Sequence, residues 1–240
     1  DNFVRIFQDQ IIWVSVKNQL IFTITDIIKH IAFPLIAAEL MYLLPGNRWR
    51  YVFRTGFILP MLVPVIVTIL LWLSIYNPTY GLLNQGLEFL GLSSMTNAWL
   101  GDSTTAIWAI IAMSFPFISG IYFLMLYAAI GNFNQEILEA SRIDGATGWK
   151  VFTKMHIPLL IPMFKLIVIL VIIGSLQDFV KILVLTDGGP GTATVIPALT
   201  MYTVAFTSSE YGYAASIGTC LFLVIIALTI FNLKFLKTDY

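Results

Sequence analysis

Charged side chains interrupt the first apolar stretch of this sequence, and they are the first residues that could do chemistry. Asp26 and His30 lie one helical turn apart, so a helix would place them on one face as a metal pair or a proton relay. One histidine and one aspartate make a small ligand set. Lys29 and Glu39 lie in the same stretch, and charges in apolar surroundings need a protein or water environment. The alternative is a helix packed against other helices, with its charges paired or near an interface.

Hydroxyl, amide and carboxylate groups also gather in two later apolar stretches. Such groups near aromatic rings suit a transient sugar site, because sugars bind through hydroxyl hydrogen bonds and aromatic stacking. The same groups can instead form hydrogen bonds between helices. A buried carboxylate at Asp178 should face either water or Lys181, one turn further on. The residues that we predict for a substrate pathway are Ser114, Tyr122, Ser175, Gln177 and Asp178.

Catalytic motifs are absent from the sequence. A membrane-embedded hydrolase or proton-relay enzyme would have to use Asp178, or Asp26 with His30. No second aspartate within an apolar stretch shares a motif with Asp178, and neither H-E-x-x-H nor G-x-S-x-G occurs. The glycine-rich run 185–194 lacks the phosphate-binding pattern G-x-x-x-x-G-K-S/T. We therefore predict no catalytic residues, no metal site and no cofactor in this chain.

The composition places the chain in a lipid bilayer. Of its 240 residues, 58% are hydrophobic and 11% are charged, and the mean hydropathy is +0.88. These values are far too apolar for a soluble domain of this size. The net charge of zero argues against a nucleic-acid partner. The single Cys220 excludes a disulfide framework within the chain.

Five segments are long enough to span a hydrocarbon core as helices, which takes about 20 residues. Alternating strand patterns are missing, so we predict an all-α, polytopic transmembrane helical bundle that forms a single domain over 1–240. Pro60 and Pro64 should interrupt the second span; kinked spans suit a moving pore, although proline is also common in transmembrane helices. The predicted spans are about 19–44, 53–75, 104–127, 159–185 and 214–235.

The lysine and arginine residues predict the orientation, because they favour cytoplasmic loops. They occur between spans one and two, between spans three and four, and in the tail, whereas 77–103 and 186–213 contain none. We expect the C-terminus to be cytoplasmic and, with an odd number of spans, 1–18 to lie outside. An external N-terminus without a preceding span suggests that the sequence is a fragment of a six-span chain.

The only long polar island of the sequence lies at 132–162. Asn132 and Gln135 form a capping-box pattern for a short helix, Asp144-Gly145 is a good helix stop, and a second short helix follows before Pro158. Two helices joined by a glycine bend at the membrane surface make a protrusion that suits a groove on another protein. The alternative is an ordinary amphipathic cytoplasmic loop.

This island contains Glu139-Ala140-Ser141, Asp144-Gly145-Ala146, Trp149, Phe152 and Ile157-Pro158-Leu159-Leu160. The series resembles the EAA loop of ABC-importer permeases, with Ser141 in place of the more usual second alanine. The runs Tyr80-Gly81-Leu82-Leu83-Asn84 and Trp99-Leu100-Gly101 are similar to the YGLLN and WLG signatures of sugar permeases. The segment 186–215 resembles the TxGGP…T…Y…AF…GYA…A pattern of the maltose-type sugar permeases.

The resemblance implies a membrane-spanning permease subunit of an ABC importer in the bacterial cell membrane, which moves a sugar or oligosaccharide by alternating access. It implies several partners: a second homologous permease subunit in a heterodimer, two cytoplasmic ATPase subunits that bind ATP and Mg, and an extracytoplasmic solute-binding protein. The alternative is a permease of the same architecture for a non-sugar solute. The residues that the resemblance assigns to ATPase coupling, within the EAA loop 132–158, are Glu139, Ala140, Ser141, Asp144, Gly145 and Ala146.

Overall fold

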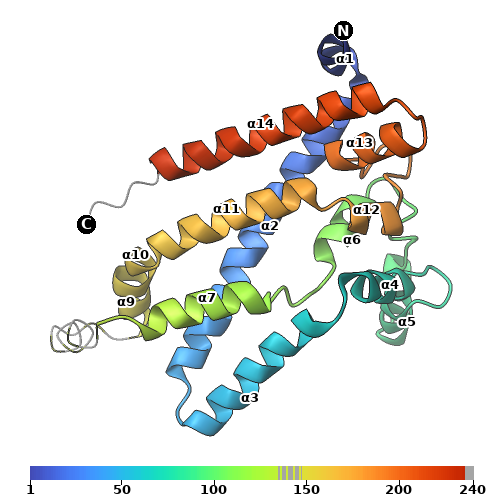
Figure 1. Cartoon of the computed structure of the whole chain (residues 1–240). Coiled ribbons are helices and arrows are strands. Elements are labelled where there is room, and N and C mark those ends of the chain that lie inside the picture. Colours follow the sequence, from blue (N-terminus) through green and yellow to red (C-terminus); the bar gives the residue numbers. More distant parts are fainter. Residues whose placement is uncertain (135, 137–138, 140–142, 144–145, 147, 236–240) are drawn as a thin grey trace. The chain divides into compact units, whose positions relative to one another are not determined.

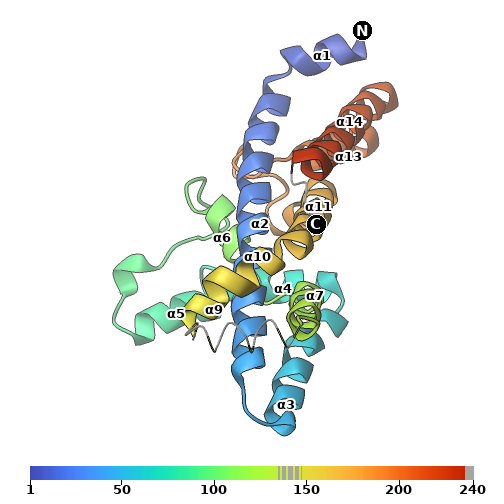
Figure 2. The same cartoon turned by 90° about the vertical axis from the view of Figure 1, so that its left-hand side faces the viewer.

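Every secondary-structure element in the described part of the chain is helical. The computed structural model describes residues 1–134, 136, 139, 143, 146 and 148–235. Its elements run from α1 (Asn2–Gln8) to α14 (Tyr211–Phe235), as Figures 1 and 2 show. A helix suits apolar stretches in lipid because it satisfies its own backbone hydrogen bonds. The predicted all-α class is confirmed.

The chain forms two compact units. The first contains Asp1–Asp26, Val63–Phe115 and Ile172–Leu228, and the second contains Ile27–Leu62, Pro116–Val171 and Thr229–Tyr240. Three long helices continue from one unit into the other, namely α2 (Gln10–Leu43), α11 (Ile161–Gln177) and α14. Each unit has its own cluster of buried apolar side chains.

Among the described residues, two helices are long and apolar enough to cross a bilayer alone. α2 contains 34 residues, and Tyr211–Lys234 of α14 contains 24. At 1.5 Å per residue α2 is about 50 Å long, so it extends beyond a hydrocarbon core of about 30 Å. It begins at Gln10, earlier than the predicted start of the first span at Gln19.

Two further apolar segments are broken helices. α3 (Asn47–Ile58) and η1 (Leu59–Leu62) are separated from α4 (Val65–Ile75) by a break at Pro64. Proline removes backbone donors, so the predicted interruption of the second span is confirmed. α9 (Trp149–Val151), the π-helix η3 (Phe152–His156) and α10 (Ile157–Leu159) turn by 63° into α11. With each broken pair counted as one span, length and composition give up to four spans in the described chain.

The third predicted span is not one helix. α6 (Ala106–Ala112) and α7 (Gly120–Gly131) are separated by a connection in which Ser114 and Phe117 have φ of 71° and 62°. A continuous right-handed helix cannot pass through residues in the left-handed region. The structure therefore does not confirm the predicted number of five spans, and this segment is the reason.

In the first unit, α12 (Val180–Leu185) lies against α4 and α13 (Pro197–Phe206). The glycine-rich run forms the loop between α12 and α13. The side-chain amide of Asn18, on α2, donates hydrogen bonds to the carbonyl oxygens of Thr192 and Val195 at 3.1 and 3.0 Å. α2 thus holds this loop in place. The buried core here contains Phe22, Ile69, Ile107, Ile110, Ile182, Leu185, Ile196, Ala198 and Leu199.

The segment between α4 and α6 brings two sequence motifs together. Its short helices are α5 (Leu82–Phe89) and η2 (Ser93–Met95). The Asn84 side chain donates to the Asn97 carbonyl oxygen at 3.0 Å and accepts from the Trp99 indole nitrogen at 2.7 Å. At Gly81 a Cβ would lie 2.3 Å from the Asn77 carbonyl oxygen, so only glycine fits this turn. The side chain of Asn84 therefore connects the YGLLN motif to the WLG motif.

A turn at Asp102 leads from this segment into α6. The Asp102 carboxylate accepts hydrogen bonds of 2.8 Å from both the backbone N–H and the hydroxyl of Thr104. These hydrogen bonds, the backbone one first, hold the pKa of the Asp102 carboxyl below its usual value. The ionised carboxylate therefore stabilises the turn.

In the second unit, the C-terminal half of α2 packs with α7, α10 and the start of α11. α7 approaches α3 closely at Gly120, where a Cβ would lie 2.9 Å from the Phe57 carbonyl oxygen. At the end of α2, the Arg50 guanidinium donates to the carbonyl oxygens of Leu44 and Tyr42 at 2.8 and 3.2 Å. These bonds satisfy carbonyl groups that a helix end leaves open. The buried core contains Leu35, Ala37, Ala38, Met41, Phe123, Leu126, Ile130, Leu160, Ile167 and Val171.

Candidate functional site

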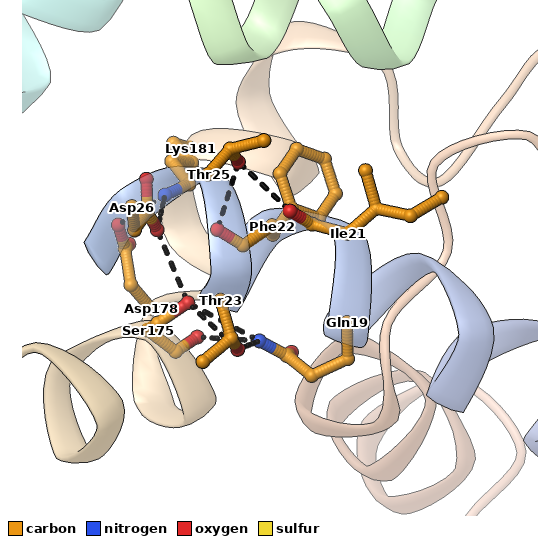
Figure 3. A network of polar contacts seen from close by, with 9 residues as sticks. All are labelled: Gln19, Ile21, Phe22, Thr23, Thr25, Asp26, Ser175, Asp178 and Lys181. Atoms are coloured by element: carbon orange, nitrogen blue, oxygen red, sulfur yellow. Dashed lines mark hydrogen bonds and ion pairs between the residues drawn. The ribbon is translucent and has the colours of Figure 1, made fainter. Parts of the chain in front are cut away.

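A polar network joins α2 to the end of α11 within the first unit (Figure 3). The Gln19 side-chain amide donates to the Ser175 carbonyl oxygen at 3.0 Å and to Thr23 Oγ1 at 3.1 Å. The Ser175 hydroxyl donates to Asp26 Oδ2 at 3.1 Å. Gln19, Thr23 and Asp26 share one face of α2, because they follow one another at helical spacing. This polar face of α2 is therefore the one that meets α11.

Lys181, on α12, lies between two carboxylates. Its Nζ is 3.2 Å from Asp178 Oδ2 and 3.7 Å from Asp26 Oδ2. The exposed fractions of the side chains are 15% for Lys181, 6% for Asp26 and 42% for Asp178. Asp26 and Lys181 thus form a buried ion pair, and Asp178 has one open side. Of the two environments expected for Asp178, the structure shows the pairing with Lys181.

The break between α11 and α12 allows Asp178 to take part in this network. α11 ends at Gln177 and α12 begins at Val180, so Asp178 lies between the two helices and one turn before Lys181. Two carboxylates around one ammonium group leave an excess of negative charge. An open carboxylate accepts hydrogen bonds from hydroxyl groups. The arrangement therefore suits a neutral polyhydroxy ligand better than an anion.

The five predicted pathway residues fall in both units. Ser175 and Asp178 belong to the network of the first unit, and Gln177 is exposed beside them at the end of α11. Ser114 is exposed in the connection between α6 and α7. Tyr122, in the second unit, lies on α7 with its ring edge-on to His30 at a centroid distance of 5.1 Å. The structure thus brings Ser175 and Asp178 into one network through Asp26 and Lys181. Gln177, Ser114 and Tyr122 are not among the residues that these contacts join.

Asp26 and His30 contact different groups. Asp26 binds Ser175 and Lys181, whereas His30 contacts the Tyr122 ring. Lys29 lies 5.5 Å from the centroid of the Phe117 ring, a cation–π contact. Within the described residues, no group of three or more His, Cys, Asp or Glu side chains could hold a metal ion. These contacts favour the alternative of a packed helix with partnered charges.

The segment with the EAA pattern is described only in part. Glu136, Glu139 and Ile143 are helical and exposed, and Ala146 is half-buried. Asn134 Oδ1 accepts a hydrogen bond of 2.8 Å from the Glu136 N–H, so Asn134 begins this helix. The predicted cap Asn132 is wrong, since Asn132 ends α7 instead. The predicted residues Gln135, Ala140, Ser141, Asp144 and Gly145 lie outside the described residues.

Two large apolar side chains of this segment are open to solvent. Ile143 and Trp149 are 86% and 74% exposed. Large apolar side chains at such exposure can be covered by another protein. The carboxylate of Glu139 is exposed as well.

A buried pair at the base of this segment was not predicted. His156 Nδ1 lies 2.8 Å from Glu39 Oε1 and 3.0 Å from Oε2, with side-chain exposures of 3% and 12%. The sequence predicts that Glu39 needs a partner, but no spacing or motif points to His156.

Comparisons with known proteins give consistent matches. Residues 30–237 match a family model described as "Binding-protein-dependent transport system inner membrane component". The probable ABC transporter permease protein YurN of Bacillus subtilis is 34% identical over 238 residues, which are 99% of this chain and 81% of that protein. The trehalose/maltose transport system permease protein MalF of Thermococcus litoralis is 31% identical over 237 residues, 97% of this chain and 77% of that protein.

Solved structures show the same fold. A chain from a bacterial alginate ABC transporter, in complex with an alginate pentasaccharide-bound periplasmic protein, has a TM-score of 0.88. It is 20% identical in sequence, and the match covers 100% of this chain and 84% of that chain.

Proposed function

Because this chain belongs to the family of binding-protein-dependent transport system inner membrane components, we propose that it is the permease subunit of an ATP-driven importer for a sugar or oligosaccharide. Membership confirms the resemblance read from the EAA, YGLLN and TxGGP patterns. It also makes the chain an integral inner-membrane transport subunit rather than an enzyme.

One observation carries the choice of a sugar. The chain aligns over 97% of its length with a trehalose/maltose permease at 31% identity. Relatives named as permeases for diacetylchitobiose and lactose are each 29% identical over 92% and 95% of this chain. The open carboxylate of Asp178 supports the same choice, because sugar hydroxyls can donate hydrogen bonds to it.

We expect the substrate to pass Ser114, Tyr122, Ser175, Gln177 and Asp178. These side chains offer hydroxyl, amide and carboxylate groups and one aromatic ring, which is the set that sugars require. Asp178 and Gln177 are the accessible members in the described network. Ser175 is buried and positions Asp26.

The segment 132–158 is proposed as the coupling loop, which docks on a cytoplasmic ATPase. Its exposed Glu139 can pair with a cation in a groove of the ATPase, and Ile143 and Trp149 can fill apolar parts of that groove. Small residues permit close approach of the two backbones. The residues proposed for coupling are Glu139, Ala140, Ser141, Asp144, Gly145 and Ala146.

The proposed assembly follows from the need for a closed pathway. One permease chain supplies half of a two-fold pore, so we expect a second, related permease as a heterodimeric partner. Two ATPase subunits would bind ATP and Mg, and an extracytoplasmic binding protein would deliver the substrate. We further propose five spans, with the interrupted α6–α7 segment crossing as one of them, and a cytoplasmic C-terminus.

Reconstitution tests the proposed substrate class. The chain is purified with its partner permease, ATPase and binding protein in lipid vesicles, and ATP hydrolysis is measured against a panel of neutral oligosaccharides, uronates, amino acids and metal ions. We expect neutral oligosaccharides to stimulate hydrolysis. Stimulation only by members of the other classes would contradict the sugar assignment and leave the permease assignment in place.

Gly145→Val tests the coupling loop. A β-branched residue resists the left-handed backbone that an Asp-Gly helix stop requires, so we expect an assembled complex whose ATP hydrolysis no longer responds to substrate. Gly131→Val is the matched control, since a Cβ there would meet no atom within 4 Å. If ATP hydrolysis of Gly145→Val still responds to substrate as in the unchanged protein, the assignment of 132–158 as the coupling loop is wrong.

A further inference from the structure

We infer that His156 and Glu39 form a clasp that fixes the coupling loop to α2, so that loop and helix move as one body. The inference rests on the proposed function, because it concerns how a movement of that loop reaches the spans. We define the clasp as His156 and Glu39 together with the rings of Phe133 and Tyr42.

The clasp joins the two ends of the coupling loop. Phe133 lies where the loop begins, after α7, and His156 lies where it ends, at the last residue of η3. The two rings contact each other at a centroid distance of 5.2 Å. The loop is therefore closed at its base by this contact.

The clasp also connects the base of the loop to α2. Glu39 accepts from His156 Nδ1 with both carboxylate oxygens, at 2.8 and 3.0 Å. Tyr42, one turn further along α2, contacts the His156 ring edge-on at 5.4 Å. The Tyr42 carbonyl oxygen accepts from Arg50 of α3. The C-terminal part of α2 thus contacts both the clasp and Arg50 of α3.

Burial makes this contact specific. The His156 side chain is almost fully covered, and its Nε2 is buried without a hydrogen-bond partner among the described residues. Nδ1 therefore provides the polar contact that orients the ring. A hydrogen bond to a charged, desolvated acceptor is stronger than one to a neutral group. His156 is also the last residue of a π-helix, and short π-helical segments are frequent at functional sites.

Spin-label distances test the clasp in the complete importer. Labels are placed at Ile143 on the loop and at Leu40 on α2, which are 86% and 59% exposed, in a background in which Cys220 is replaced by serine. The distance is measured without nucleotide and after trapping with ATP and vanadate. In the otherwise unchanged protein we expect one narrow distribution in both states, since the two sites move together.

Three variants separate the hydrogen bond from packing. His156→Phe keeps a ring against Phe133 and Tyr42 but removes the hydrogen bond, so the distribution should broaden on trapping while the complex still assembles and hydrolyses ATP. Glu39→Gln keeps an acceptor and should retain the narrow distribution. Thr153→Val removes a hydrogen bond local to η3, to the Trp149 carbonyl oxygen, and should behave like the unchanged protein.

The double variant Glu39→Leu with His156→Phe guards against loss of folding, because it leaves no buried charge unpaired. An assembled double variant or His156→Phe variant with the narrow distribution in both states would overturn the clasp. Gly145→Val distinguishes this result from failure of the proposed function. If Gly145→Val uncouples and His156→Phe changes nothing, the clasp alone is wrong; if Gly145→Val also couples normally, the coupling loop itself is wrong.

Discussion

Neutralising Asp26 and neutralising Asp178 should have very different effects, although both carboxylates contact Lys181. Asp178 is the closer partner, at 3.2 Å against 3.7 Å. At equal dielectric this difference changes the Coulomb energy by about 15%. Exposure differs far more, at 42% for Asp178 and 6% for Asp26, and the effective dielectric varies several-fold between surface and interior. Burial therefore outweighs distance here.

The expected magnitudes follow from this difference in burial. Asp26→Asn removes one partner of a buried ion pair and should cost about 3–5 kcal/mol of the free energy of unfolding. Asp178→Asn removes a half-exposed partner that solvent screens and should cost about 1 kcal/mol or less. For a chain of this size, each kcal/mol of lost stability lowers the melting temperature by about 2–4 °C. Thermal melting of the purified complex should therefore distinguish the two variants.

Transport gives the second measurement. Asp178→Asn should change the transport affinity or the sugar preference in an assembled complex, because the amide keeps the size of the side chain but loses an acceptor oxygen. Asp26→Asn with Lys181→Met is the control and should recover much of the stability lost in Asp26→Asn, since no buried charge remains unpaired. Equal losses of melting temperature in Asp26→Asn and Asp178→Asn would show that burial does not decide the strength of these two ion pairs. Unchanged kinetics of Asp178→Asn across a sugar panel would remove Asp178 from the pathway.

Three further predictions concern close packing and orientation. Gly120→Val should destabilise the chain by about 1–3 kcal/mol through overpacking, because a Cβ added at Gly120 would lie 2.9 Å from the Phe57 carbonyl oxygen of α3; an unchanged melting temperature would contradict it. Gly81→Ala should open the segment 77–103 to limited proteolysis, because a Cβ there lies 2.3 Å from a backbone oxygen, whereas Gly86→Ala meets no atom within 4 Å and should be cleaved like the unchanged protein. A cysteine at Asn2, with Cys220 replaced, should react with an impermeant maleimide from outside the cell, and labelling from the cytoplasmic side alone would show that the proposed orientation is wrong.

The helical architecture could be predicted because hydrophobicity and proline positions fix it locally. The run before Leu43 and the run after Tyr211 form long helices, and Pro64 breaks the second span as expected. The α6–α7 segment could not be predicted in this way. Its hydropathy is that of a span, but Ser114 and Phe117 take left-handed backbone conformations. Such conformations are unfavourable for residues that have a Cβ. Tertiary contacts must stabilise such a conformation, and composition does not reveal them.

The polar site could be predicted only where partners are close in the sequence. The pairing of Asp178 with Lys181 lies within one helical turn and was one of two expected cases. The contacts of Asp26 with Ser175 and of Glu39 with His156 join residues that are far apart in the chain. Neither residue pair has a spacing that a periodicity argument could use. The helical spacing of Gln19, Thr23 and Asp26 was the one available signal, since it marks a polar face on α2.

α2 connects the two features that transport would use. It carries Asp26 of the polar network and Glu39 of the clasp on one helix without a break between Gln10 and Leu43. Pro34 lies between Asp26 and Glu39, and proline is the usual cause of a bend within a helix. If 132–158 acts as the proposed coupling loop, its displacement would reach Asp26 either as a shift of α2 or as a bend at Pro34. Replacing Pro34 with alanine should stiffen α2. The spin-label distances of the clasp variants, measured with Pro34 and with alanine at this position, would then separate the two routes, because only the bend depends on Pro34.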